Sequence, residues 1–163
     1  MPERDTIERA HEDAREGKSP STQAGEFVRE EMEHIREGKH GARSTKQAIA
    51  IGLSEARRAG VKLPAGKTAS AGTRRKAKRD LAKGKRPRKT SRKRARAVSA
   101  ALRREGHQAA SHGSLSAHAK SSARRRSASQ RSASARQAAR TKGAAGRSAA
   151  ARKAARTRAR HRG

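Results

Sequence analysis

Aromatic residues and cysteine are almost absent from this sequence of 163 residues. It contains no cysteine, tryptophan or tyrosine, and Phe27 is its one phenylalanine. The lack of cysteine excludes disulfides and thiolate metal sites. The lack of aromatic rings argues against a surface that recognises RNA or single strands by stacking on bases. No apolar run approaches the ~18 residues of a membrane span, and none follows the charged N-terminus, so we expect a soluble intracellular protein without a membrane partner.

Apolar residues are scarce as well. They make up 31% of the chain, whereas charged residues make up 36% and the net charge is +30. Such a chain has too little apolar surface to offset its conformational entropy, which favours disorder. The composition therefore predicts a mostly disordered chain with a small all-α N-terminal part, in which an αα-hairpin is followed by an intrinsically disordered, low-complexity cationic tail.

The excess charge is confined to one part of the sequence. Residues 1–64 carry 12 basic and 12 acidic residues, whereas residues 65–163 carry 32 basic residues and only two acids, Asp80 and Glu105. We therefore expect a neutral head (residues 1–64) and a cationic tail (residues 65–163). So strong an asymmetry indicates a polyanionic partner.

The head contains the clearest helix signals. Ser19 and Pro20 are typical of a helix start and Gly38 of the position past a helix end, which predicts a helix over about 20–37. Its apolar face comprises Ala24, Phe27, Val28, Met32 and Ile35. The opposite face, expected to be solvated, comprises Glu26, Glu30, Glu33 and Glu37. Glu31 interrupts the edge of the apolar face.

A second helix is predicted over about 45–59. It begins at the capping-box sequence Ser44-Thr45-Lys46-Gln47 and ends at Gly60. The link between the two helices is short, which predicts an αα-hairpin over residues 19–64. Residues 1–18 predict only a weak helix, because they contain one large apolar residue besides the initiating methionine.

Small residues follow one side of the second helix. Ala48, Gly52 and Ala56 lie four residues apart, a spacing that permits close approach of another helix. The head has few large apolar side chains, so a lone hairpin is expected to be marginal. Two expectations follow: the head forms only marginal helices, of which the second is an ordinary alanine-rich one, or it self-associates as a homodimer that packs through these three residues.

Clusters of arginine and lysine recur along the tail and are the candidate nucleic-acid-binding residues. They are Arg74, Arg75, Lys76, Lys78, Arg79, Lys83, Lys85, Arg86, Arg88, Lys89, Arg92, Lys93, Arg94, Arg96, Arg124, Arg125, Arg126, Arg152, Arg156 and Arg160. Arginine outnumbers lysine 22 to 10 in the tail, and guanidinium groups suit bidentate contacts with phosphate. Binding of this kind is largely independent of base sequence and weakens steeply with salt.

Two parts of the tail have helical patterns. One is residues 91–105, and the other contains Arg152, Arg156 and Arg160, which repeat every four residues. Repulsion between like charges at this spacing opposes helix formation in free solution. We therefore expect these helices only when nucleic acid neutralises the charge.

No catalytic motif is present. The sequence has no Walker A loop, no dinucleotide fingerprint and no serine in a G-x-S-x-G setting, so neither an enzyme nor a cofactor is predicted. The seven histidines are His11, His34, His40, His107, His112, His118 and His161. None is paired at i, i+4 spacing and no cysteine accompanies them, so no metal site is predicted.

Residues 39–64, KHGARSTKQAIAIGLSEARRAGVKLP, resemble the core of a family of short, uncharacterised bacterial proteins that often carry Lys/Arg/Ala-rich extensions. The tail is similar in composition to the C-terminal domains of linker histones and bacterial histone H1-like proteins. Together, the resemblances imply a bacterial, nucleoid-associated protein, and they bring no catalytic residues with them.

The function expected from the sequence is histone-like binding and compaction of duplex DNA by the tail, independent of base sequence, at the nucleoid in the cytoplasm. Phosphate contacts alone do not separate DNA from RNA, so an RNA- or ribosome-associated basic protein is one alternative. A further alternative makes the head an interaction module for another protein, which the tail only tethers to the nucleoid.

Overall fold

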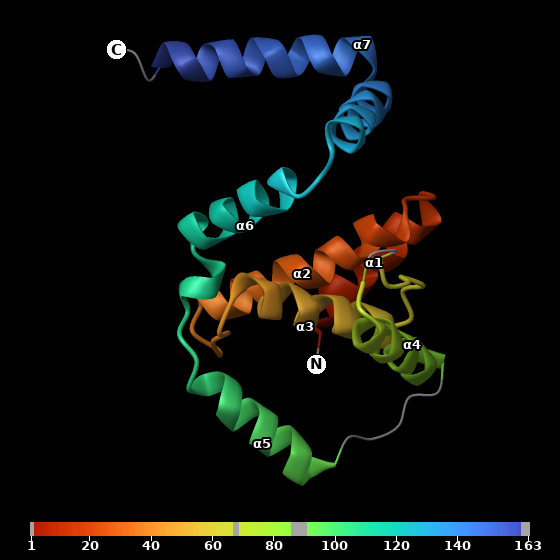
Figure 1. The fold of residues 1–163 in the computed structure, drawn as a ribbon, viewed down its shortest axis with the longest axis vertical. Coiled ribbons are helices and arrows are strands. Elements are labelled where there is room, and N and C mark those ends of the chain that lie inside the picture. The colour runs from red at the N-terminus through yellow and green to blue at the C-terminus, as the bar shows by residue number, and fades with distance from the viewer. Residues whose placement is uncertain (1, 67–68, 86–90, 161–163) are drawn as a thin grey trace. The chain divides into compact units, whose positions relative to one another are not determined.

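Helices dominate the computed structural model, which describes residues 2–66, 69–85 and 91–160 (Figure 1). The α-helices of these ranges are α1 (Arg4–Arg15), α2 (Pro20–Arg36), α3 (Thr45–Arg58), α4 (Ala71–Lys85), α5 (Arg92–Arg103), α6 (His112–Arg124) and α7 (Ala128–Arg160), with a 3₁₀ turn, η1 (Gln108–Ala110). The prediction of a mostly disordered chain is therefore wrong. Four of the helices lie in the region that was expected to be an intrinsically disordered, low-complexity tail.

The chain divides into two compact units, residues 1–118 and residues 119–163. The first contains α1 to α5 and η1, and α6 crosses the boundary between the units. Helix α7, in the second unit, is interrupted at Gly143, whose φ of 63° is not helical, and none of its described residues is buried. In the described ranges, no helix has both the length and the apolar character to cross a membrane.

Helices α2 and α3 begin at the capping residues that the sequence indicates. The Ser19 hydroxyl accepts a hydrogen bond from the Thr22 N–H at 3.3 Å, and the Ser44 hydroxyl accepts one from the Gln47 N–H at 3.2 Å. Past the helix ends, Gly38 and the glycine that follows α3 adopt positive φ values of 76° and 104°. Both helices lie within one residue of their predicted bounds, because these signals are local.

The small residues of α3 pack against α2 of the same chain. Ala48 and Ala56 are fully buried. A Cβ atom added to Gly52 would lie 2.8 Å from the Val28 Cα and 2.9 Å from the Phe27 carbonyl oxygen. The close approach expected between two copies is therefore made within one chain, and this stripe leaves no exposed surface for a homodimer.

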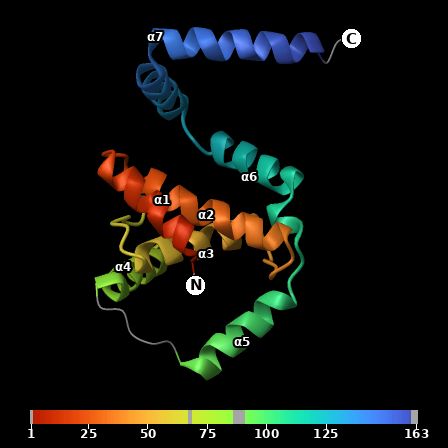
Figure 2. The same cartoon turned by 180° about the vertical axis from the view of Figure 1, so that it is seen from behind.

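Helix α1 is a full helix of 12 residues that covers one side of α2 (Figures 1 and 2). Its Ala10 is buried in a cluster with Phe27, and Ile7 packs against the same cluster. Because α1 lies there, the glutamates of α2 are not a uniformly solvated row. Glu30 is 3% exposed, and Glu26 forms an ion pair of 2.8 Å with Arg9.

Residues of the expected tail complete the other end of this core. Ala109 and Ala110 of η1 are buried in a second cluster, whose remaining members are Met32, Ile35, Ala42 and Ala48. The Thr45 hydroxyl donates to the Ala109 carbonyl at 2.7 Å, and the Arg36 Nε–H donates to the Ala110 carbonyl at 3.0 Å. The apolar surface that we expected a second copy to cover is therefore covered by the chain itself.

Helix α4 packs on α3 (Figure 2). Ala77 and Asp80 face α3 and are each 3% exposed. Gly84 permits the contact, because a Cβ atom there would collide with the Arg57 carbonyl oxygen. The folded part of the chain therefore extends beyond the expected head, through α4, and we call α1 to α4 with η1 the helical core.

Candidate functional site

Helix α4 separates its charges between two faces. Its seven basic residues are all exposed, and they are Arg74, Arg75, Lys76, Lys78, Arg79, Lys83 and Lys85. Its one acid, Asp80, lies on the face buried against α3. The charged side chains that α4 presents to the solvent are therefore all cationic.

Asp80 fixes α4 to the helical core and is itself neutralised. The Ser54 hydroxyl donates to Asp80 Oδ2 at 2.8 Å, and the Arg58 Nε–H donates to Asp80 Oδ1 at 3.1 Å. The Ser54 hydroxyl is buried with it, whereas the Arg58 side chain is 48% exposed. The one negative charge of α4 is thus compensated by a residue of α3.

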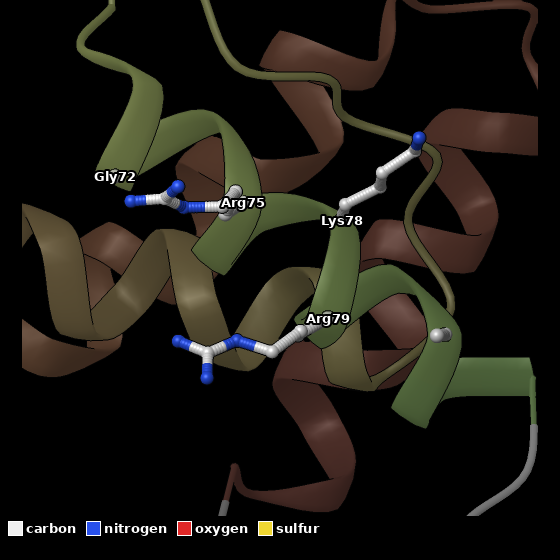
Figure 3. A pocket seen from close by; sticks show the side chains of 5 residues that line it. Gly72, Arg75, Lys78 and Arg79 are labelled. Carbon is white, nitrogen blue, oxygen red and sulfur yellow. The ribbon is translucent and has the colours of Figure 1, made fainter.

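A shallow hollow runs beside α4, lined by Gly72, Arg75, Lys78, Arg79 and Ala82 (Figure 3). In Figure 3 the Arg75 and Arg79 side chains point to the same side of the helix, one turn apart, and Lys78 points to the other side. Cations that spread around a helix suit an extended polyanion such as a phosphate backbone. They do not form the enclosed pocket that holds a small molecule.

The predicted binding residues outside α4 are equally accessible where the structure describes them. Those of α5, of α6 with the turn that follows it, and of α7 are all exposed, whereas Arg86, Arg88 and Lys89 lie outside the described residues. Further exposed cations of α6 and α7 that we did not single out are Lys120, Arg131, Arg136, Arg140, Lys142, Arg147, Lys153 and Arg158. Within the described ranges, no cation after Pro64 forms an ion pair with a carboxylate.

Helix formation arranges some of these cations in rows. Arg152, Arg156 and Arg160 lie in the second part of α7, in helical backbone. Because a helix rises about 1.5 Å per residue, these three arginines follow one another at about 6 Å along one face. The expectation that this segment is helical only on nucleic acid is wrong, and so is the same expectation for residues 91–105, which contain α5.

A second group of chemically active side chains lies inside the helical core, where no metal site was predicted. Glu31, His34 and His40 each bring one ligand atom to within 4.8 Å of the others, and so do Glu3, Glu30 and His34. We call these five residues the acid–histidine cluster. Glu31 and His34 lie three residues apart on α2, and His40 lies in the link to α3.

The two central carboxylates of this cluster are buried. The side chains of Glu30 and Glu31 are 4% and 2% exposed, and Glu30 Oε2 and Glu31 Oε1 have no hydrogen-bond partner. Burial, followed by the charges of Glu55 and Glu30, raises the pKa of Glu31 to about 7. Burial also raises the pKa of Glu55 on α3.

One family model matches part of the chain. Residues 15–67 are similar to a family of unknown function, DUF6496. The matched segment contains α2 and α3 and the sequence 39–64, which agrees with the expected likeness to an uncharacterised family. No curated protein and no solved structure matches the chain.

Proposed function

We propose that this protein binds nucleic acid, duplex DNA above all, through phosphate contacts that do not depend on base sequence. The observation that carries the proposal is the segregation of charge on α4, whose cations face solvent while its one acid is buried and paired with Arg58. A solubilising surface has no need to hide its only acid in this way. A surface that meets a polyanion gains from it, because no carboxylate then faces the phosphates.

The remaining helices support the same proposal. Within the described ranges, helices α5 and α7 have no buried residues, and their cations form no ion pairs with carboxylates. Repulsion between such cations is relieved when they displace the counterions condensed on DNA. The protein lacks the aromatic residues that stacking on bases requires. The contacts of these cations with nucleic acid are therefore made to the phosphate backbone.

Neutralising α4 is expected to weaken DNA binding and to reduce its salt dependence. The test variant replaces Arg74, Arg75, Lys78 and Arg79 with glutamine, which has a similar helix propensity. If all four contact phosphates, the slope of log K against log salt becomes less negative by about 3.6, and the affinity at moderate salt falls at least about tenfold. Fluorescence anisotropy of a labelled duplex across a salt series measures both quantities.

A matched variant distinguishes the contribution of α4 to DNA binding from the contribution of net charge. It replaces four exposed cations of the helical core and its loops, Arg4, Arg43, Lys46 and Lys62, so it loses the same charge. We expect its salt slope to change by less than about one unit. Equal losses in both variants, or a preference above about tenfold for one of two unrelated duplexes, would contradict the proposal. A parallel titration with duplex RNA decides between DNA and the RNA-associated alternative.

A further inference from the structure

Two carboxylates of the acid–histidine cluster, those of Glu30 and Glu31, lie where solvent cannot compensate their charge. Glu30 and Glu31 are adjacent on α2, both are almost fully buried, and each has one carboxylate oxygen without a hydrogen-bond partner. Burying unpaired carboxylates is costly, and proteins retain such groups where a cation or a proton compensates them.

Each imidazole group lies beside one of the two buried carboxylates. His40 Nε2 lies 3.6 Å from Glu31 Oε2, and His34 Nε2 lies 3.7 Å from Glu30 Oε1. The His34 and His40 ring centroids are 6.1 Å apart, and the ring planes are 76° from parallel. Ligands of a tetrahedral zinc ion bound at about 2.05 Å are separated by about 3.3 Å. The His40–Glu31 and His34–Glu30 distances are thus only a few tenths of an ångström longer.

The tautomer of His40 also suits a metal ligand. Its Nδ1 lies 3.2 Å from the Gly41 carbonyl oxygen, which only accepts hydrogen bonds. Nδ1 therefore carries the hydrogen, and Nε2 of the neutral ring keeps its lone pair on the side of Glu31. A hydrogen bond from the second ring nitrogen to a carbonyl is the arrangement that orients metal-binding histidines in proteins.

From this geometry we propose that Glu31, His34 and His40 bind a divalent transition-metal ion of the zinc class as its three protein ligands. Imidazole with carboxylate is a ligand set that suits such ions, and it does not favour calcium or magnesium, which take oxygen ligands alone. The ion is structural in this position. It ties the α2–α3 link, through His40, to the buried face of α2, and Glu3 brings the start of α1 beside it.

Metal titration of the full-length protein tests the site without reference to nucleic acid. The protein is freed of metal with a chelator and of nucleic acid at high salt, and is then titrated calorimetrically with Zn²⁺. Co²⁺ serves as a second probe, since its visible absorption reports tetrahedral coordination. We expect one equivalent to bind and to raise the melting temperature of the helical core. Absence of a saturable equivalent would overturn the proposal.

Variants locate the bound ion. Glu31→Gln and His40→Gln should each lower Zn²⁺ affinity at least about 100-fold, since even the loss of groups that support ligands costs 10- to 100-fold. Glu31→Gln removes a buried charge, so it keeps the fold and remains informative if His40→Gln does not fold. The control replaces the exposed residues His11 and Glu33 with glutamine and should bind Zn²⁺ as the parent does. Parent-like affinity in Glu31→Gln, or a matching loss in the control, would place the metal elsewhere.

Discussion

Gly52→Ala is expected to destabilise the helical core by at least about 2–3 kcal/mol, although alanine is the better helix former. The added Cβ would lie 2.8 Å from the Val28 Cα and 3.0 Å from the Val28 nitrogen. Both are backbone atoms of α2, so no side-chain rotation can relieve the contact. The two helices must separate, and Ala48 and Ala56 then lose their packing on either side of Gly52.

Gly25→Ala is the matched control for this prediction. Gly25 lies inside α2, is exposed, and would bring its Cβ within 4 Å of nothing. There the ordinary helix preference acts alone, so the substitution should stabilise the protein by about 0.5–1 kcal/mol. If the same Gly→Ala substitution changes the stability of the protein in opposite directions at these two positions, close packing between α2 and α3 is the cause.

Hydrogen exchange followed by mass spectrometry measures this effect locally. Global helix content is a poor probe, since α5 and α7 have no buried residues and contribute signal of their own. Peptides from α2 and α3 of Gly52→Ala should exchange roughly 100-fold faster than in the parent, and those of Gly25→Ala somewhat slower. Parent-like protection in Gly52→Ala would show that the helices do not approach as closely as described.

Local signals were sufficient to predict α2 and α3. Ser19 and Ser44 cap their helices through their own hydroxyl groups, and such caps depend on a few adjacent residues. The same kind of signal exists in the region expected to be disordered. The Ser70 hydroxyl accepts from the Thr73 N–H at 3.2 Å at the start of α4, and the Ser127 hydroxyl accepts from the Gln130 N–H at 3.2 Å before α7.

The tail helices were not predicted because composition indicates whether a segment can form a hydrophobic core, and not whether it forms a helix. Few apolar residues predict that a segment cannot build its own core, but alanine, arginine and lysine are among the strongest helix formers. Ser127 and Gln130 even form a reciprocal capping box, since the Ser127 N–H donates to the Gln130 side chain at 3.1 Å. In an Arg/Ser-rich segment, composition alone does not distinguish such a capping box from a chance match.

The packing of the core could not be predicted because it relies on small residues far apart in sequence. Ala10, Ala77 and Ala110 bring α1, α4 and η1 against α2 and α3, and each is at most 3% exposed. An estimate that counts only large apolar side chains omits these contacts. No local pattern distinguishes them from the many exposed alanines of the same chain.

The acid–histidine cluster did leave a signal in the sequence. Glu31 interrupts the apolar face of α2, and His34 follows it three residues later, on the same side of the helix. A charged residue on a face that packs against other helices indicates a buried carboxylate and hence a partner for it. The contribution of His40 depends on the path of the α2–α3 link, which only the structure provides.

Asp80→Ala is expected to release α4 from the helical core. The substitution leaves the buried Ser54 hydroxyl without its acceptor and the Arg58 guanidinium without its counter-charge. Removing one partner of a fully buried pair costs about 3–5 kcal/mol, but Arg58 is half exposed and solvent screens it. We therefore expect a loss of about 2 kcal/mol in the docking of α4. Asp80→Asn, which still accepts from Ser54, should lose less.

Limited trypsin digestion measures the docking of α4 directly. When α4 opens and closes quickly, cleavage after Arg74, Arg75 and Arg79 follows the population of the open state, so about 2 kcal/mol corresponds to roughly 30-fold faster cleavage. Cleavage after Arg158 in α7 provides an internal reference, because that site lies in the other compact unit. Unchanged cleavage in α4 would show that Asp80 does not hold the helix in place.

DNA binding by Asp80→Ala then shows whether the DNA affinity of α4 depends on its docking to α3 or only on its positive charge. All seven cations of the helix remain in this variant, and contacts with phosphate need their charge more than a fixed geometry. We expect the salt slope to stay within about one unit of the parent value, with affinity unchanged or slightly higher, since one negative charge is lost. A fall in affinity of about tenfold or more with the cations intact would instead show that affinity depends on geometry. In that case the packing of α4 on α3 contributes to DNA recognition, because the binding surface requires a fixed position of the helix.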